Sequence, residues 1–451
     1  MGFLWALLGF AVTIGIIVLV HEAGHLLAAK SLNVEVRRFS IGFGPVLWKR
    51  KWGETEYAVS LVPLGGYVQM TGENGTAEPV TPEERARSYD AQSKPRRALI
   101  LAAGPLMNFV LAFFCYVLLG AIGVEDLPVR LLEPPAKTAA AQAGVVGGDL
   151  VTEVDGVEIR GYTDLNLSLL GRIGEETVPV TLKRGEGSFE TQLDLSTLSL
   201  TDAAQTIVAA KLGFIPQMTG PLVIANVMKD GPGEKAGLRA GDKVLTMAGR
   251  PVATVEDFRA IVAEYADRDF PIEVESLADG SRRTLTLHPE MMTLDKAEGA
   301  QPKPAVAVSI GRLPETIVVH YGPIDSVRMG AVKLVEMLRL QVMSVGQLAQ
   351  GEGADQIAGP VGIAQSAGTA VRAGLRAMVD FVALISVAVG FMNLIPIPGL
   401  DGGHLFVMSL EALRRKDFAP QTKEKIMKGG LFVVLLIMVF ALNNDLTRLF
   451  S

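Results

Sequence analysis

The chain has 451 residues, 49% of them apolar and only 20% charged, which excludes an ordinary soluble protein with about a quarter of its residues charged. The formal net charge of −6 offers no basic surface to a nucleic acid, and the single cysteine, Cys115, excludes a disulfide or a multi-cysteine metal site. We therefore expect no nucleic-acid partner, and the remaining classes are a membrane-embedded enzyme, a transporter or an anchored binding module.

Four apolar stretches are candidates for membrane-spanning helices, which need about 17–25 residues. They cover residues 3–20, 98–121, 381–397 and 431–442. The third is interrupted near its end by Asn393 and two prolines, and the fourth reaches spanning length only with the preceding residues 426–428. The first lacks the basic start and the small-residue cleavage site of a signal peptide, so we expect it to be retained. The sequence predicts a multi-pass α-helical membrane protein with four spans in the lipid bilayer.

The distribution of Lys and Arg predicts how the spans are oriented. The connection 28–97 contains 11 of these residues and the connection 398–428 contains six. Short loops rich in Lys and Arg stay on the cytoplasmic side of a membrane. We therefore expect both connections in the cytoplasm, and both termini and the long section between the second and third spans on the opposite side.

The long middle section contains an internal repeat. Residues 143–149 and 236–242 align at an offset of 93 residues, and each reads Ala-Gly-x-x-x-Gly-Asp. In each copy a short alternating strand, a glycine turn and a helix follow, and strands such as 178–182 and 272–276 close the copy. The sequence thus predicts two α+β domains, at residues 125–210 and 211–292.

The remaining domain bounds follow from the spans and the repeat. We place the first two spans in residues 1–124 and the last two in residues 376–451. Between the repeat and the third span, in residues 293–375, we expect a linker and then a helix. Apolar side chains recur at helical intervals over 326–350, which predicts an amphipathic helix on the membrane or against the repeat.

The end of the first span carries the motif that says most about function, His21-Glu22-Ala23-Gly24-His25. Histidines four residues apart lie on one face of a helix, so both imidazoles can bind one zinc ion. Glu22 is placed to take a proton from a water molecule at that ion. The alternative, a structural pair of histidines, leaves a buried glutamate at the end of an uncharged span unexplained. We therefore predict zinc as the cofactor and Glu22 as a general base.

A catalytic zinc needs a third protein ligand and one open position. His288 and His320 fall in the middle section, across the membrane from the motif in this topology. Asp401 and His404 lie at the end of the third span, and the chemistry of the sequence alone does not choose between them. The prolines and glycines of residues 393–404 break the helix there, and irregular backbone at membrane depth is tolerated where it lines a cavity.

Taken together, these segments resemble the site-2 protease family of intramembrane metalloproteases. The family pairs His-Glu-x-x-His in the first span with Asn-x-x-Pro-x-Pro-x-x-Asp-Gly in the third, and residues 21–25 and 393–402 match both patterns. Further similar segments are residues 43–45, 63–68, 103–109 and 359–364. The repeat resembles the circularly permuted PDZ domain of bacterial proteases, which binds a peptide at a sheet edge. In this comparison residues 211–214 look like the carboxylate-binding loop of the second copy.

The resemblance implies roles for individual residues. Asp401 becomes the third zinc ligand beside His21 and His25, Glu22 the general base, and Asn393 a residue that contacts the substrate backbone. The resemblance therefore makes the chain a zinc metalloendopeptidase.

The resemblance also implies a substrate class. A membrane-associated β-hairpin is expected within residues 48–71, where Gly65, Gly66 and Tyr67 bind an unwound substrate helix. The substrates are then single-span membrane proteins already shortened by another protease: an anti-sigma factor in envelope stress signalling, and remnant signal peptides. The expected location is the bacterial inner membrane, with the PDZ-like domains in the periplasm and the active site facing the cytoplasm.

Two other functions are considered beside this one. A zinc-sensing or zinc-transporting protein would use the PDZ-like domains to bind partners without proteolysis. A transporter needs polar residues along several spans, whereas here they gather at one level beside Glu22. A metalloprotease for soluble substrates, anchored by its first span, conflicts with a motif that lies within that span.

Overall fold

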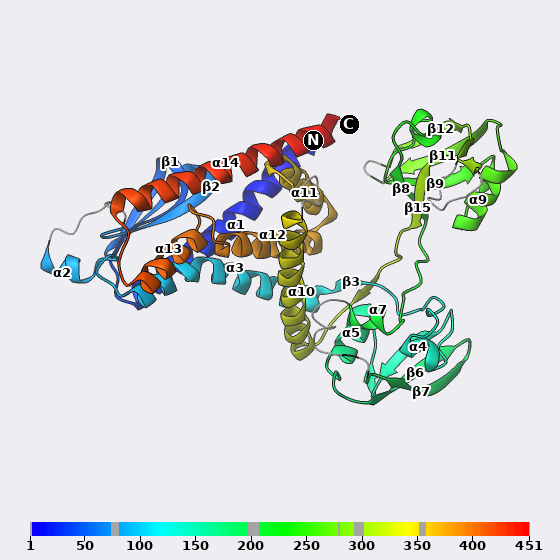
Figure 1. Ribbon diagram of the computed structural model, residues 1–451, viewed down its shortest axis with the longest axis horizontal. Helices are drawn as coiled ribbons and strands as arrows, with labels where there is room; N and C mark the ends of the chain where they lie inside the picture. The colour runs from blue at the N-terminus through cyan, green and yellow to red at the C-terminus, as the bar shows by residue number, and fades with distance from the viewer. Residues whose placement is uncertain are drawn as a thin grey trace. The chain divides into compact units, whose positions relative to one another are not determined.

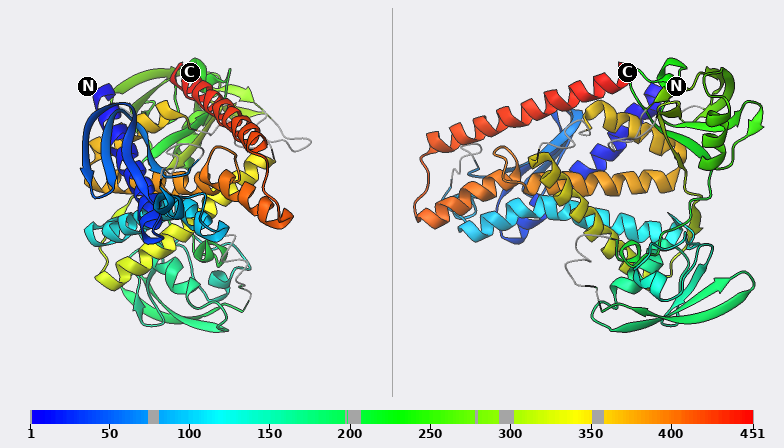
Figure 2. Two further views of the ribbon diagram at one scale, coloured as in Figure 1. Left: turned by 90° about the vertical axis from the view of Figure 1, so that its left-hand side faces the viewer. Right: turned by 45° about the vertical axis from the view of Figure 1, so that its right-hand side comes forward.

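The computed structural model describes residues 2–73, 81–196, 198, 207–277, 280–292, 302–350 and 358–450. These residues divide into two units, one formed by Met1–Val124 with His320–Ser451 and the other by Glu125–Val319. The first unit contains the long helices and a β-hairpin, and the second contains two β-rich modules (Figure 1, Figure 2).

In the described part of the first unit, four helices are long and apolar enough to cross a membrane, in agreement with the four predicted candidates. They cover Leu4–Ser31, Lys94–Ile122, Leu375–Leu394 and Gln421–Thr447. The fourth is much longer than the predicted 431–442 because its helix continues through polar residues at both ends. The elements of this unit are α1 Gly2–Ser31, β1 Val36–Trp52, β2 Thr55–Met70, α2 Pro82–Ala86, α3 Lys94–Ile122, α10 Pro323–Ala349, α11 Pro360–Ala373, α12 Leu375–Leu394, α13 Asp401–Arg414 and α14 Pro420–Phe450.

The centre of the first unit is formed by α1, α3 and α12 (Figure 1). α1 packs against α3 and α11, and α3 packs against α12 and α10. Close approach of helix backbones replaces the hydrophobic effect as the source of helix association in lipid. Gly9 of α1 provides such an approach, because a Cβ there would lie 2.7 Å from the main-chain oxygen of Ala367 in α11.

α10 corresponds to the amphipathic helix predicted over 326–350. Its side chains Leu334, Met337 and Leu338 pack against a cluster of α3 and α12 residues that includes Tyr116. A Cβ at Gly330 would lie 2.8 Å from Cγ2 of Val117, so α10 crosses α3 at close range. Part of the apolar surface of this helix therefore packs on α3 and α12, a partner that its periodicity did not identify, whereas Val335, Val342 and Val345 are exposed.

The β-hairpin after α1 is one antiparallel pair, β1 and β2, with several register shifts. Its base packs on the end of α1 through buried side chains such as Val36, Phe39 and Met70. Residues 43–52 of β1 are exposed throughout. The hairpin covers the region predicted to be β-rich, although its strands begin earlier, at Val36.

The described residues of the second unit include two larger sheets, each with a core of its own, and the two-stranded pair β13 and β14. The first sheet has the strand order β5-β4-β6-β7 and the second has the order β12-β11-β9-β8-β15, with β10 beside β9. The elements of this unit are β3 Val124–Asp126, α4 Ala139–Gln142, β4 Leu150–Val154, β5 Val157–Glu158, α5 Tyr162–Leu170, β6 Thr177–Arg184, β7 Gly187–Asp194, α7 Val208–Lys211, β8 Leu222–Val227, α8 Pro232–Lys235, β9 Asp242–Met247, β10 Arg250–Pro251, α9 Val255–Glu264, β11 Phe270–Ser276, β12 Arg282–Leu287, β13 Glu290–Met292, β14 Lys303–Ala305, β15 Val308–Arg312 and β16 Ile317–Val319. The strands predicted at 178–182 and 272–276 are present as β6 and β11.

The repeated Gly-Asp pair makes the same contacts in both modules. Asp149 is fully buried and accepts hydrogen bonds from the main-chain N–H of Val146, at 3.0 Å, and from the Arg184 guanidinium, at 2.7 Å. Asp242 accepts equivalent bonds from the N–H of Arg239 and from Arg283. A buried carboxylate needs such partners, which explains why this dipeptide recurs.

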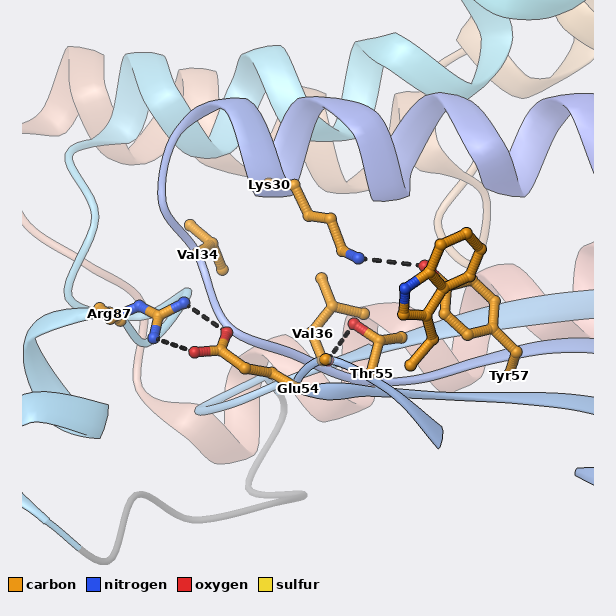
Figure 3. A pocket seen from close by; sticks show the side chains of 9 residues that line it. Lys30, Val34, Val36, Glu54, Thr55, Tyr57 and Arg87 are labelled. Atoms are coloured by element: carbon orange, nitrogen blue, oxygen red, sulfur yellow. Dashed lines mark hydrogen bonds and ion pairs between the residues drawn. The ribbon is translucent and has the colours of Figure 1, made fainter. Parts of the chain in front are cut away.

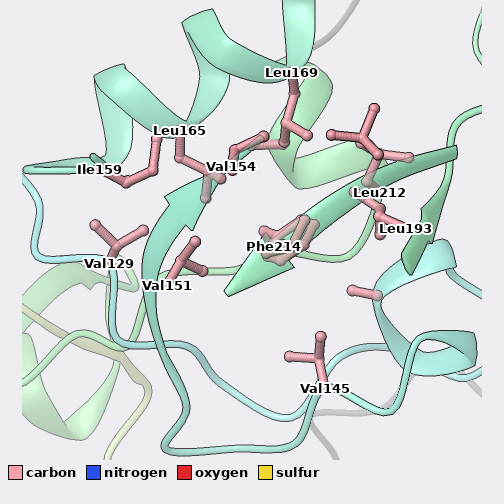
Figure 4. Packing of buried hydrophobic residues seen from close by; sticks show 14 of the residues in the cluster. Val129, Val145, Val151, Val154, Ile159, Leu165, Leu169, Leu193, Leu212 and Phe214 are labelled. Carbon is pink, nitrogen blue, oxygen red and sulfur yellow. The ribbon is translucent and has the colours of Figure 1, made fainter. Parts of the chain in front are cut away.

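The cores shift the domain boundary that the repeat predicts. The first core runs from Val129 to Phe214 and includes Leu212. Figure 4 shows Leu212 and Phe214 in one cluster with Val151 and Leu169. The expected boundary at 210/211 therefore falls inside the first core, and residues 211–214 belong to the first module rather than to a loop of the second. The second core runs from Leu222 to Val306, and β15 completes its sheet, so this module extends past the expected end at 292. Residues 293–301, at the start of the linker expected within 293–375, lie outside the described residues.

Candidate metal centre

His21 and His25 lie in the last third of α1 and point toward one place. The spacing of four residues places both rings on one face of the helix. Their Nε2 atoms are 3.2 Å apart, and the two residues are only 9% and 8% exposed. Two buried imidazoles thus present nitrogen atoms to the same small volume.

Asp401 comes from the far end of the chain, at the first residue of α13. Pro396 and Pro398 follow the end of α12 and prevent the helix from continuing. The chain turns there, and Oδ2 of Asp401 lies 3.1 Å from Nε2 of His21 and 3.5 Å from Nε2 of His25. One ligand atom from each of the three residues lies within 4.8 Å of the other two.

The glycine after Asp401 is required by close packing. A Cβ on Gly402 would lie 2.5 Å from the main-chain carbon of Leu394, so α13 begins directly against the end of α12. His404, the other candidate ligand, lies about one turn further along α13 and is not part of the described cluster. Burial lowers the pKa of its imidazole. The geometry therefore favours Asp401 over His404, a choice that the sequence left open.

The three side chains fit a zinc ion. Two imidazole nitrogens and one carboxylate oxygen form a donor set of catalytic zinc sites, which leaves one position open. Nδ1 of His25 lies 2.8 Å from the main-chain oxygen of Ile100, so the N–H donates there and Nε2 keeps its lone pair for a metal. Gly104 of α3 leaves room beside the rings, because a Cβ there would lie 2.9 Å from Nε2 of His21 and still closer to His25. Ile100 gave no sequence signal because it contributes only a carbonyl.

Glu22 contacts the strand that the sequence linked to substrate binding. A Cβ on Gly66 would lie 2.9 Å from Cγ of Glu22, so the main chain of β2 passes directly against this glutamate. Gly65 precedes this contact, and the Tyr67 ring after it stacks on Phe43 with centroids 6.3 Å apart. The structure thus brings Gly66 to the candidate general base, while Gly65 and Tyr67 contact Phe43.

Asn393 lies in the last turn of α12, just before the break that leads to Asp401. It is half-buried. Within the described part of the chain its side chain makes no hydrogen bond, so its amide is available to another molecule.

A half-buried carboxyl near the centre was missed by the sequence analysis. Glu73 follows β2, and its Oε2 accepts a hydrogen bond from the N–H of Met70 at 3.5 Å. Burial raises the pKa of Glu73 to about 7, while the nearby His25 opposes the rise and Glu22 adds to it. No pattern in the sequence marks this residue, because it lies outside the metal motifs.

A separate pocket of about 420 Å³ lies between the end of α1 and the hairpin (Figure 3). Lys30 donates a hydrogen bond to the hydroxyl of Tyr57 at 3.1 Å on one side of it. On the other side Arg87 binds both carboxylate oxygens of Glu54, at 2.7 and 2.6 Å. None of the three candidate ligands lines this pocket, so it belongs to the base of the hairpin and not to the metal centre.

Comparison with known proteins decides the family. The profile of peptidase family M50 matches residues 9–437 of this chain. The chain belongs to peptidase family M50. It is 35% identical over 463 residues to the regulator of sigma-E protease RseP of Escherichia coli, and the match covers 100% of both chains. The protein of the same name from Salmonella typhimurium is 35% identical over 457 residues, with 99% of each chain covered.

A third relative carries the cofactor in its name. A Pasteurella multocida protein, named as a zinc metalloprotease, is 34% identical over 455 residues and is covered completely, as is this chain. Membership of family M50 and these relatives make the chain a zinc metalloendopeptidase of the site-2 protease type and a membrane protein with four candidate spans. The predicted family, enzyme class and zinc cofactor are confirmed.

Proposed function

We propose that this M50 peptidase performs regulated intramembrane proteolysis on single-span membrane proteins, cutting them within or near the membrane-spanning segment. The observation that carries the proposal is the position of the ligand cluster: His21 and His25 belong to a candidate span, and Asp401 follows another. By analogy with the sigma-E proteases it resembles, the substrate is an anti-sigma factor in envelope stress signalling, first shortened by another protease. Remnant signal peptides form a second substrate class.

The chemistry divides among few residues. His21, His25 and Asp401 would hold a zinc ion, which when bound would supply an electrophilic centre and lower the pKa of a water molecule toward 7. Glu22 accepts the proton of that water and delivers it to the leaving amine of the cut peptide bond. Its place against the main chain of β2 fits this role, because a substrate strand beside β2 would lie next to the carboxylate.

Substrate binding uses an unpaired strand edge. The segment from Gly66 to Met70 pairs on one side with Val36–Ile41 of β1. No strand pairs with its other side in the described part of the chain. A free edge can bind an extended peptide through main-chain hydrogen bonds, which a helical substrate provides only after it unwinds. Gly65, Gly66 and Tyr67, with the amide of Asn393, are proposed to hold that unwound segment.

The membrane orientation and the role of the two modules complete the proposal. The Lys- and Arg-rich connections support an inner-membrane protein whose active site faces the cytoplasm and whose β-rich modules are periplasmic. We assign these modules as PDZ-like domains that restrict access of substrates with bulky ectodomains. Removing residues 125–319 would then permit cleavage of an intact substrate, whereas loss of cleavage of the shortened substrate would argue for peptide recognition.

A matched pair of proteins tests the proposed reaction. Truncated single-span membrane proteins are co-expressed with the wild type or with Glu22→Gln, which keeps the volume and the zinc ligands but removes the base. Cleavage should fall at least about 100-fold in the variant while zinc content stays near one ion per chain. Equal cleavage by both proteins would exclude Glu22 from the reaction. Cleavage of no membrane substrate by a zinc-loaded wild type would favour the rival function in zinc sensing or transport.

A further inference from the structure

The second nitrogen of the His21 ring determines whether this residue can bind a metal through Nε2. A neutral imidazole carries one proton, so Nε2 has a free lone pair only when the proton is on Nδ1. His25 meets this condition through the carbonyl of Ile100, 2.8 Å from its Nδ1. The corresponding neighbour of His21 is the side-chain amide of Asn108 in α3, whose Nδ2 lies 3.2 Å from Nδ1.

The orientation of the Asn108 amide depends on that proton. Asn108 is fully buried, and its Oδ1 has no hydrogen-bond partner in the described part of the chain. The nitrogen and oxygen of an amide have the same shape and are assigned from their partners. When Nδ1 of His21 carries the proton, the amide turns so that Oδ1 accepts it. In either orientation, one of the two amide atoms of Asn108 has no described partner. The position of the proton on the His21 ring therefore decides which orientation is favoured.

Asn108 is held firmly in place by α12. The Ser386 hydroxyl donates a hydrogen bond to the main-chain oxygen of Asn108 at 2.8 Å. A Cβ on Gly390 would lie 3.1 Å from Cβ of Asn108, so the two helices touch at this residue. α12 thus fixes the backbone and Cβ of Asn108, which limits its side chain to rotation against the His21 ring.

We propose that Asn108 is a positioning residue for the metal centre. Its side-chain oxygen accepts the Nδ1 proton of His21, selects the form of the ring that binds metal through Nε2, and fixes the rotation of the ring. The inference rests on the proposed role of His21 as a ligand. The Ile100 carbonyl beside His25 and the Asn108 amide oxygen beside His21 then keep both rings protonated on Nδ1, so that each Nε2 is free to bind the metal.

Zinc affinity tests this role without reference to proteolysis. Full-length proteins purified in detergent compete with a chelator for zinc. Asn108→Leu keeps a similar volume but removes the acceptor, and zinc binding should weaken about 10- to 100-fold, the usual effect of losing such a partner. Asn108→Asp keeps an acceptor and should bind zinc within about 3-fold of the wild type, a loss smaller than the 10- to 100-fold expected without the acceptor. Ser386→Ala is the matched control, because it removes a buried contact to the main chain of Asn108 and leaves its amide intact.

The outcomes distinguish failure of the proposed role of Asn108 from failure of the proposed zinc ligand set. A folded Asn108→Leu protein that binds zinc as tightly as Ser386→Ala overturns the inference. If Asn108→Leu does not fold, nitrogen NMR of histidine-labelled, zinc-loaded wild type decides. The inference expects a protonated Nδ1 on His21 whose shift changes in Asn108→Asp, and a protonated Nε2 overturns it. Unchanged zinc affinity in His21→Ala would instead contradict the proposed ligand set.

Discussion

A single methyl group at position 104 is expected to disrupt metal binding while leaving the protein folded. A Cβ on Gly104 would lie 2.6 Å from Cε1 of His25 and 2.9 Å from Nε2 of His21. Carbon atoms in contact are separated by about 3.5 Å, so the His25 ring must move by about 1 Å. Metal sites tolerate ligand displacements of about 0.2 Å. A displacement of about 1 Å at a reactive centre typically lowers the reaction rate about 100-fold. We expect the zinc affinity of Gly104→Ala to fall by a similar factor, because the ligand atoms are displaced by the same distance.

The same substitution has a small effect on folding. Alanine is a better helix former than glycine by about 1 kcal/mol. Overpacking of a well-filled interior costs about 1–3 kcal/mol. The net loss of about 0–2 kcal/mol is small beside the stability of about 5–15 kcal/mol of a typical folded domain. Loss of zinc without loss of the fold is therefore the expected result.

Gly15→Ala is the matched control for this prediction. Gly15 also lies within a membrane-spanning helix, α1, but a Cβ there would meet no atom within 4 Å. Both variants are compared with the wild type by chelator competition for zinc and by thermal unfolding in the same detergent. Equal zinc affinity in Gly104→Ala and Gly15→Ala would refute the argument, because it would mean that the rings can yield without leaving the metal.

Three further outcomes are expected. Asp445 is 4% exposed and accepts hydrogen bonds from two main-chain N–H groups at the start of α11, so Asp445→Ala should destabilise the protein by about 1–3 kcal/mol in thermal unfolding, and an unchanged melting temperature would contradict this. The Arg184 guanidinium holds the pKa of Asp149 below its usual range, so hydrogen-exchange protection of β4 should be full above about pH 4 and fall as the pH drops through the lowered pKa, a dependence that Asp149→Asn should remove. In intact cells, Gly53→Cys in a Cys115→Ala background should react with a membrane-permeant maleimide only; reaction with an impermeant reagent added outside would reverse the proposed orientation.

The sequence specified local chemistry better than long-range arrangement. The spacing of His21 and His25 sufficed to predict a metal pair, because a helix converts that spacing into a shared face. The choice between Asp401 and His404 could not be made the same way, because it depends on how closely α13 begins against the end of α12. The family resemblance, and not the spacing, named Asp401.

The same limit explains the displaced module boundary and the unforeseen packing of α10. The repeat was located by its Gly-Asp pairs, which lie in the middle of each module and say little about where its chain begins and ends. Phe214 looked like the start of a second copy, yet it completes the core of the first. An apolar helical face indicates that a helix has an apolar partner but does not identify it. For α10 the partners are α3 and α12, and Gly330 permits the close contact with α3.

The members of the ligand cluster are synthesised at very different times. The ribosome completes the histidine pair 376 residues before it reaches Asp401. At translation rates of about 5–20 residues per second, a growing chain spends on the order of tens of seconds with the histidine pair but without Asp401. A chain that ends before residue 401 has the pair and the glutamate but lacks the proposed third ligand. If Asp401 is the third zinc ligand, as proposed, the peptidase cannot act on neighbouring membrane proteins before the ribosome has passed both β-rich modules.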